Sequence, residues 1–207
     1  MAYPNKLSEK LRVYSPQEDT WFLFDVLKSQ LKQDPLNQLP YLVVCEVGAG
    51  SGFISIELSK KFPQIQFLAT DISLQSIITC HKNMFESIQR DRFDVVCMDL
   101  LHGLNPETFQ PEIIFFNPPY VRTCEEEVMK AFSWAGGPSG LVVIQKFLED
   151  LSRFSFRKAF FLSSVYNENK LLKTNFQGIF ESQVIAERKI EDERLLCYEV
   201  QLKNNPE

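Results

Sequence analysis

The chain has 207 residues, of which 44% are apolar and 24% are charged, as expected for one soluble globular domain. Its formal net charge of -5 argues against a protein that binds nucleic-acid phosphates through a basic face, so nucleic acid is not an expected partner. Because no signal peptide is visible and no apolar run approaches the length of a membrane span, we expect no membrane association and a cytoplasmic protein, with the nucleus also open.

The hydrophobic pattern predicts strands that alternate with helices. Residues 1–15 are polar, and residues 16–40 hold a helix and a linker, with Ser15 and Pro16 suited to the start of that helix. The predicted strands are 42–46, 66–70, 93–98, 113–116 and 159–163, and the later predicted helices are 53–62, 73–88, 140–154 and 167–174. Two β-rich runs, 179–187 and 195–202, predict an antiparallel hairpin joined by the charged residues between them.

This alternation predicts an α/β fold with a doubly wound, mostly parallel seven-stranded sheet and a C-terminal antiparallel hairpin, in one Rossmann-like domain over residues 1–207. In such sheets the ligand lies outside the carboxyl ends of the strands. Polar residues end the first four predicted strands: Glu46, Asp71, Asp99 and Asn117. We therefore expect these four side chains to line one crevice.

A glycine-rich loop follows the first predicted strand. Gly48, Gly50 and Gly52 fall within five positions, although the whole chain has only 8 glycines. Glycine permits positive φ and a close approach of backbone to ligand, and the loop opens a helix whose first N–H groups are free. This spacing also occurs in dinucleotide-binding folds, so the loop alone leaves the ligand open, and a tight turn without a ligand is the alternative.

Acidic residues follow the next two strands. Asp71 suits the hydroxyls of a ribose, and a cap for the following helix is the alternative explanation. Asp99 suits an exocyclic amine such as that of adenine, and the Leu100 N–H suits a ring nitrogen. A solvated strand end is the alternative explanation for Asp99.

The most specific motif is the sequence Asn117, Pro118, Pro119, Tyr120 after the fourth strand. Two prolines restrict the loop and supply no N–H, so the loop presents carbonyl acceptors. The Asn117 side-chain oxygen adds another acceptor, and Tyr120 adds a flat wall. Rigid acceptors of this kind suit a planar NH2 group.

Taken together, these motifs resemble the class-I S-adenosylmethionine-dependent methyltransferases that carry an NPPY motif. Residues 14–20 (YSPQEDT) resemble the YxPxEDT segment of HemK-like protein glutamine methyltransferases, and residues 132–137 (FSWAGG) resemble their AWAGG segment, with Ser133 in place of alanine. Over residues 13–202 the chain is similar to the eukaryotic and archaeal subfamily that methylates the class-1 translation termination release factor. The chain is too short for the additional N-terminal domain of the bacterial enzymes.

The resemblance implies S-adenosylmethionine as cofactor and S-adenosylhomocysteine as product. The implied cofactor-binding residues are Tyr14, Thr20, Glu46, Gly48, Gly50, Asp71, Asp99, Leu100 and Asn117. Thr20 would lie near the cofactor carboxylate and Glu46 near its ammonium group. Asp71 would bind the ribose hydroxyls, and Asp99 with Leu100 would read the adenine.

The resemblance also implies the catalytic set Asn117, Pro118 and Tyr120 and, as acceptor, the glutamine of the GGQ motif in the release factor. An amide nitrogen is a weak nucleophile and no strong base is visible in the sequence. Two acceptors that grip its N–H bonds can instead orient the nitrogen and stabilise the positive charge that develops on it. We therefore expect Asn117 to act without a general base.

A small zinc-binding activator subunit is the partner that the resemblance implies. In the family the third strand, here 93–98, is an edge of the sheet, and an apolar edge can accept another strand. Five scattered cysteines without CxxC spacing and only two histidines argue against a zinc site in this chain, so we assign it no metal ligand. A loop that covers the edge is the alternative.

Other functions remain open at this level. An adenine-N6 nucleic-acid methyltransferase would use the same motif, because adenine also presents a planar NH2 group, but the acidic net charge argues against it. Histone lysine and small-molecule acceptors are further alternatives. A non-catalytic cofactor-binding scaffold is the remaining one, and the intact NPPY motif argues against it.

Overall fold

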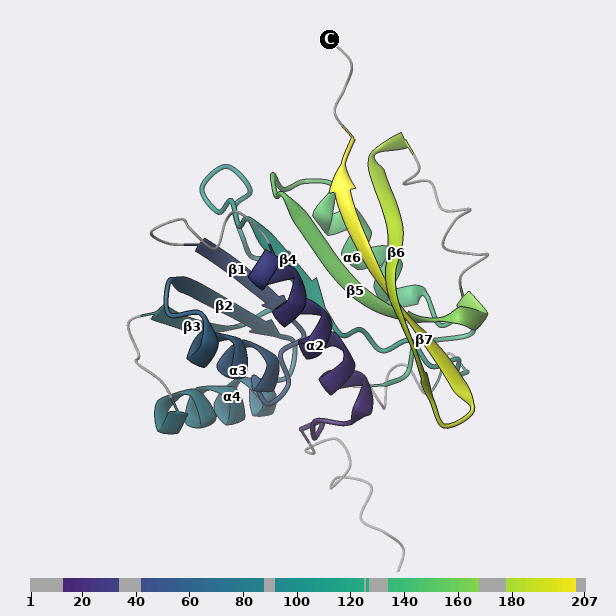
Figure 1. The fold of residues 1–207 in the computed structure, drawn as a ribbon, viewed down its shortest axis with the longest axis horizontal. Helices are drawn as coiled ribbons and strands as arrows, with labels where there is room; N and C mark the ends of the chain where they lie inside the picture. Colours follow the sequence, from purple (N-terminus) through teal and green to yellow (C-terminus); the bar gives the residue numbers. More distant parts are fainter. Residues whose placement is uncertain are drawn as a thin grey trace, which may run out of the picture.

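A seven-stranded sheet organises the computed structural model, which describes residues 13–33, 42–87, 92–124, 126, 134–167 and 178–203 (Figure 1). The strands are β1 (Leu42–Val47), β2 (Ile65–Asp71), β3 (Phe93–Cys97), β4 (Ile113–Phe116), β5 (Lys158–Ser164), β6 (Phe180–Ile190) and β7 (Glu193–Leu202). The helices are α2 (Glu18–Gln33), α3 (Phe53–Lys61), α4 (Leu74–Ser87) and α6 (Val142–Leu151), with a short 3-10 helix η3 (Val165–Asn167).

The strand order is β3-β2-β1-β4-β5-β7-β6. The first five of these strands are parallel to one another, whereas β7 is antiparallel to both β5 and β6. The predicted fold class, a mostly parallel sheet that ends in an antiparallel hairpin, is therefore confirmed.

Helices cover both faces of the sheet, with α2, α3 and α4 on one face and α6 on the other (Figure 1). Strand β4 shows why its sequence is continuously apolar. Ile113 and Phe115 pack with the first group of helices, while Ile114 and Phe116 pack with α6. Because successive side chains point to opposite faces, a strand buried on both sides has no polar position.

The N-terminal helix begins later than the sequence predicts. Ser15 and Pro16 lie before α2, because the Gln17 carbonyl accepts the first intrahelical bond, from the Trp21 N–H at 3.1 Å. The Thr20 hydroxyl accepts the Gln17 N–H at 3.2 Å, which completes the cap from inside the helix. The prediction that the helix starts at Ser15 and Pro16, with Ser15 as its N-cap, is therefore wrong.

The C-terminal hairpin is longer than predicted. The charged segment 188–193, expected as a connection, is mostly strand, since the ladder continues to the pair Ile190 and Glu193. Arg188 stabilises this extension through Asp25 of α2 at 3.1 Å, and its guanidinium lies 4.8 Å from the Phe22 ring centroid.

Some expected segments fall wholly or partly outside the described residues, namely the N-terminal extension, the linker over 34–40 and most of the helix over 167–174. Helix α6 is shorter than the predicted 140–154. In the described part of the chain, no helix combines the length and the apolar character needed to cross a membrane.

Candidate active site

The parallel strands bring predicted polar residues together at the carboxyl ends of the strands. Glu46 of β1 pairs with Ala69 of β2 and with Phe115 of β4. Asp71 ends β2 and Asn117 follows β4, on either side of β1, so all three residues lie at or near the carboxyl ends of neighbouring strands. The sheet therefore brings together three of the four residues from which the sequence predicts a strand-end crevice.

The loop between β1 and α3 needs glycine for steric reasons. Gly48 and Gly52 have φ values of 63° and 75°. A Cβ on Gly48 would lie 2.6 Å from the Phe116 ring, and a Cβ on Gly52 would lie 2.4 Å from Cys80 Sγ. The loop therefore passes so close to β4 and α4 that no larger residue fits.

Asp71 connects this loop to helix α4. One of its oxygens accepts the Gly50 N–H at 2.8 Å, and the other accepts the Ser73 N–H at 2.8 Å. Burial raises the pKa of the Asp71 carboxyl, while these two amides oppose the rise. Asp71 can therefore both cap the approach to α4 and bind a ligand. One of its oxygens accepts the Ser73 N–H before the helix, and both oxygens retain lone pairs for ligand hydroxyls.

Glu46 of β1 has a buried carboxyl group that lies beside the first turn of α3. It is 4% exposed, and its Oε2 accepts the Ser55 N–H at 3.2 Å. Burial raises its pKa to about 8 despite the Ser55 contact, and the charge of Asp71 adds to the rise. A cation in the crevice would favour the ionised form of Glu46.

The stability of the ligand-free protein should fall as the pH rises from about 5 to 8, because of Glu46. Its folded pKa of about 8 exceeds the model-compound value of 4.5, so between these values the folded state holds a proton that the unfolded chain releases. Melting temperatures at several pH values should show this slope, and Glu46→Gln should flatten it. The variant Glu57→Gln, at a partly exposed position of α3, should keep it, and equal slopes in all three proteins would contradict the assignment.

The turn after β3 carries the other pair of predicted residues. Asp99 is exposed, and Leu100 has a φ of 49°, which is unusual for a residue with a Cβ. The Leu100 carbonyl accepts the Thr70 hydroxyl at 3.0 Å, and the His102 N–H closes the turn onto the Asp99 carbonyl at 3.0 Å. This turn is separated from the Asn117 loop by β2 and β1.

Asp19, in the first turn of α2, joins the N-terminal segment to the Asn117 loop. Its carboxylate is 7% exposed and accepts hydrogen bonds from four residues. The donors are Tyr14 Oη at 3.1 Å, the Thr20 N–H at 2.7 Å, Asn117 Nδ2 at 3.1 Å and Tyr120 Oη at 3.5 Å. Burial and the charge of Asp19 raise the pKa values of both Tyr14 and Tyr120, so both phenols stay protonated as donors.

The Asp19 contact orients the Asn117 side chain. Since Nδ2 of Asn117 donates to Asp19, its Oδ1 faces the other way, where it is buried and meets no partner among the described residues. A buried acceptor without a partner is costly unless a ligand supplies a donor. Pro118 beside it is buried and brings no competing N–H.

Sequence reasoning did not identify Asp19, although it lies between Tyr14 and Thr20 in the YSPQEDT segment. An acidic residue in a first helical turn is ordinary, so its sequence context carried no signal of its role. The sequence also showed no base in the site, whereas the structure places this carboxylate one hydrogen bond from Asn117. Its hydrogen bonds to four residues fix the position of its carboxylate beside Asn117.

These residues fit an organic ligand with hydroxyls and a cationic group. The acceptors of Glu46, Asp71 and Asn117 lie at the carboxyl ends of the neighbouring strands β1, β2 and β4, and the unpartnered Asn117 Oδ1 would be satisfied by a ligand donor. Across the residues that the structure describes, no group of three or more His, Cys, Asp or Glu side chains could hold a metal ion.

Residues 24–135 match the family described as the methyltransferase small domain. The chain is 34% identical to mouse Methyltransferase HEMK2 over 166 residues, which cover 76% of this chain and 73% of the relative. It is 32% identical to the eRF1 methyltransferase catalytic subunit mtq2 of Schizosaccharomyces pombe, over 80% of this chain and 78% of the relative. The fold is similar to that of the ribosomal protein L11 methylase of Lactobacillus delbrueckii subsp. bulgaricus, with a TM-score of 0.63, 16% identity and coverage of 92% and 81%.

Proposed function

Because this chain belongs to the methyltransferase small domain family, among its HemK-like members, we propose that it methylates the side-chain nitrogen of the glutamine in the GGQ motif of a class-1 translation termination release factor. The enzyme class and the cofactor, S-adenosylmethionine, come with that membership. The release factor is the acceptor named for the mtq2 relative. The unpartnered Asn117 Oδ1 is the observation that carries the proposal.

The residues of the crevice divide between cofactor and acceptor. Glu46 would hold the ammonium group of the cofactor, and Asp71 would accept the ribose hydroxyls. Asp99 and Leu100 would bind the adenine, while Thr20 would lie by the carboxylate. The remaining members of the proposed cofactor site are Tyr14, Gly48, Gly50 and Asn117.

Asn117 binds and orients the acceptor amide. When bound, S-adenosylmethionine supplies an electrophilic methyl group on a sulfonium sulfur and is left as the neutral thioether. Asn117 Oδ1 and the Pro118 carbonyl accept the two N–H bonds of the glutamine amide, which aims its nitrogen and resists rotation. As that nitrogen becomes positive, the same acceptors stabilise its charge, and the nitrogen then loses one proton to solvent, which leaves a neutral N-methyl amide. Tyr120 packs against the amide plane.

Asp19 strengthens this arrangement through Asn117. Donation from Asn117 Nδ2 to a buried carboxylate increases the electron density on Oδ1, so the oxygen becomes a better acceptor. The negative charge of Asp19 also stabilises, by electrostatic attraction, the positive charge that forms on the acceptor nitrogen. The ability of Asn117 to bind and stabilise the acceptor amide therefore depends on Asp19, which does not itself touch the acceptor.

A methyl-transfer assay with labelled S-adenosylmethionine tests the proposal. The chain would be co-expressed with a candidate activator and offered release factor with an intact GGQ motif or with that glutamine replaced. We expect label only on the intact protein. Label on DNA, RNA, histone or a small molecule instead would favour one of the alternative acceptors, and cofactor binding without any transfer would favour the scaffold.

We further propose a heterodimer with a small zinc-binding activator, located in the cytoplasm where termination takes place. Strand β3 is an edge of the sheet, as the sequence predicted, and α4 lies beside it. Exposed apolar side chains extend this edge: Ile72, Leu74, Ile78 and Phe85. Leu74, Ile78 and Phe85 recur at helical spacing on α4, so an apolar strip adjoins the free strand.

Replacing Ile78 by aspartate should break this heterodimer. Ile78 is 53% exposed, so a charge there costs little in the isolated chain but would be desolvated under a partner. We expect at least about tenfold weaker copurification with the activator. Val184→Asp, on the opposite edge strand β6 and 42% exposed, is the matched control and should copurify normally. Equal loss in both variants, or in neither, would contradict the location.

A further inference from the structure

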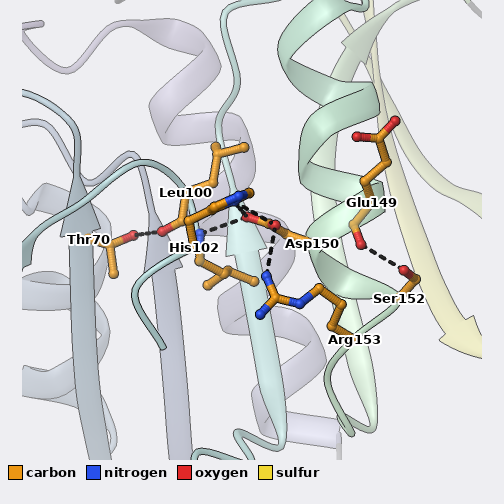
Figure 2. Close-up of polar contacts among 8 residues, drawn as sticks. Thr70, Leu100, His102, Glu149, Asp150, Ser152 and Arg153 are labelled. Atoms are coloured by element: carbon orange, nitrogen blue, oxygen red, sulfur yellow. Dashed lines mark hydrogen bonds and ion pairs between the residues drawn. The ribbon is translucent and has the colours of Figure 1, made fainter. Parts of the chain in front are cut away.

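Asp150, in the last turn of α6, is a buried carboxylate outside the crevice that the proposed mechanism does not use. It is 3% exposed and faces the turn after β3 (Figure 2). Its Oδ2 accepts the Leu101 N–H at 3.1 Å, and its Oδ1 lies 3.0 Å from His102 Nδ1 and 3.6 Å from an Arg153 guanidinium nitrogen. Two of its three contacts therefore come from the turn that carries Asp99.

The peptide group between Leu100 and Leu101 is held at both ends. Its carbonyl, that of Leu100, accepts the Thr70 hydroxyl from β2 at 3.0 Å. Its N–H, that of Leu101, donates to Asp150 from α6 at 3.1 Å. Two groups on opposite sides of the turn thus prevent this peptide plane from rotating (Figure 2).

The turn needs such support because Leu100 has a φ of 49°. This left-handed conformation is disfavoured for a residue with a Cβ and persists only where the surroundings enforce it. Leu101, fully buried against α6, adds packing to the same restraint. Release of the Leu101 N–H would let the peptide flip, and the backbone of Leu100 and the Asp99 side chain would turn with it.

We propose that Asp150 is a positioning residue that holds the turn of Asp99 and Leu100 in the conformation that reads the adenine ring of the cofactor. The inference rests on the proposed cofactor site. The groups that recognise adenine lie in the turn after β3, while the group that fixes this turn lies on α6, 49 residues beyond Leu101. The His102 side chain is 74% exposed, and its Nδ1 approaches the carboxylate from the same turn.

Calorimetric titration of two cofactor analogues into the full chain, with its activator if required, tests the positioning role of Asp150. The probes are S-adenosylhomocysteine and S-inosylhomocysteine, in which an oxygen replaces the 6-amino group. We expect Asp150→Ala to weaken S-adenosylhomocysteine about tenfold and to reduce the preference for it by a similar factor. Asp150→Asn keeps an acceptor for Leu101 and should bind within about threefold of the wild type.

Glu199→Gln is the matched control, since Glu199 is also a buried carboxylate with three side-chain partners, on β7. It should leave the preference unchanged. Hydrogen exchange of the Leu101 amide in the cofactor-free wild type gives a test that needs no variant and should be much slower than that of exposed Gly103.

Equally fast exchange at Leu101 and Gly103, an unchanged preference in Asp150→Ala, or an equal loss in Glu199→Gln would overturn the positioning role alone. A wild-type chain that binds neither probe would overturn the proposed cofactor site together with this inference.

Discussion

Asn117→Ala should abolish methyl transfer while the protein still binds its cofactor. The substitution removes the one buried side-chain oxygen of the Asn117 loop that has no partner, and with it the acceptor that orients the nucleophile. Loss of a hydrogen-bonding group that acts on developing charge costs about 100-fold to 1,000-fold in kcat. Single-turnover rates with a release factor substrate and calorimetric titration of S-adenosylhomocysteine would measure the two effects separately.

The isosteric variant Asn117→Asp sharpens this test. It would place a second carboxylate against Asp19, where Nδ2 now donates at 3.1 Å, so the two like charges would repel. We expect low activity from this variant even though an acceptor oxygen is still present. A cofactor affinity that falls as far as the rate in Asn117→Ala would show that Asn117 serves the cofactor rather than the acceptor.

Asp19→Asn should lower kcat by about 10-fold to 100-fold with a smaller change in the KM for the release factor. An asparagine amide presents its own N–H bonds to a site where four residues already donate, so at least one hydrogen bond to it is lost. Asn117 is then free to rotate its amide, and Oδ1 no longer faces the acceptor in every molecule. Loss of a hydrogen bond to a charged group is worth about 1.5 to 3 kcal/mol, which corresponds to this range of rates.

Asp25→Asn is the matched control for Asp19. Asp25 lies on the same helix but is half exposed, and its contact to Arg188 at 3.1 Å is a surface ion pair. Such pairs contribute about 0 to 1 kcal/mol, so the rate should remain within about twofold of the wild type. The side-chain NH2 of Asn117 provides a second readout, since its exchange with solvent should accelerate in Asp19→Asn only. Wild-type kcat in Asp19→Asn would remove Asp19 from the proposed mechanism.

Selection of the acceptor is a separate matter from its activation. The proposed site of Asn117, Pro118 and Tyr120 would bind a planar NH2 group, and both a glutamine amide and an adenine amine satisfy that description. The apolar strip on α4 and the acidic net charge of -5 favour a protein partner and a protein acceptor. The assay with an intact and an altered GGQ motif separates these acceptors directly.

The architecture of the sheet was predictable because its signals are local. The apolar run of β4, buried on both faces, and the polar residues that follow β1 and β2 are properties of short segments. Parallel strands then place those polar residues at one edge whatever the details of packing. The glycine loop was predictable for the same reason, since the close approach to Phe116 needs a residue without Cβ at Gly48.

Strand and helix ends were less predictable. The first bond of α2 is made by the Gln17 carbonyl and not by that of Ser15. Strand β6 runs through charged residues because its ladder with β7 continues to the pair Ile190 and Glu193. In both places a tertiary or hydrogen-bonded contact outweighs the local preference of the sequence.

The fold class, the polar residues at the ends of β1, β2 and β4, and the NPPY motif could all be predicted from short segments of the sequence. The direction in which the Asn117 side chain points could not, because its partner Asp19 lies 98 residues away and reaches it when α2 packs across the sheet. Likewise, the bond from Leu101 to Asp150 forms only when α6 packs against the turn after β3. Contacts of this kind follow from the burial of whole helices, which no short segment of sequence encodes.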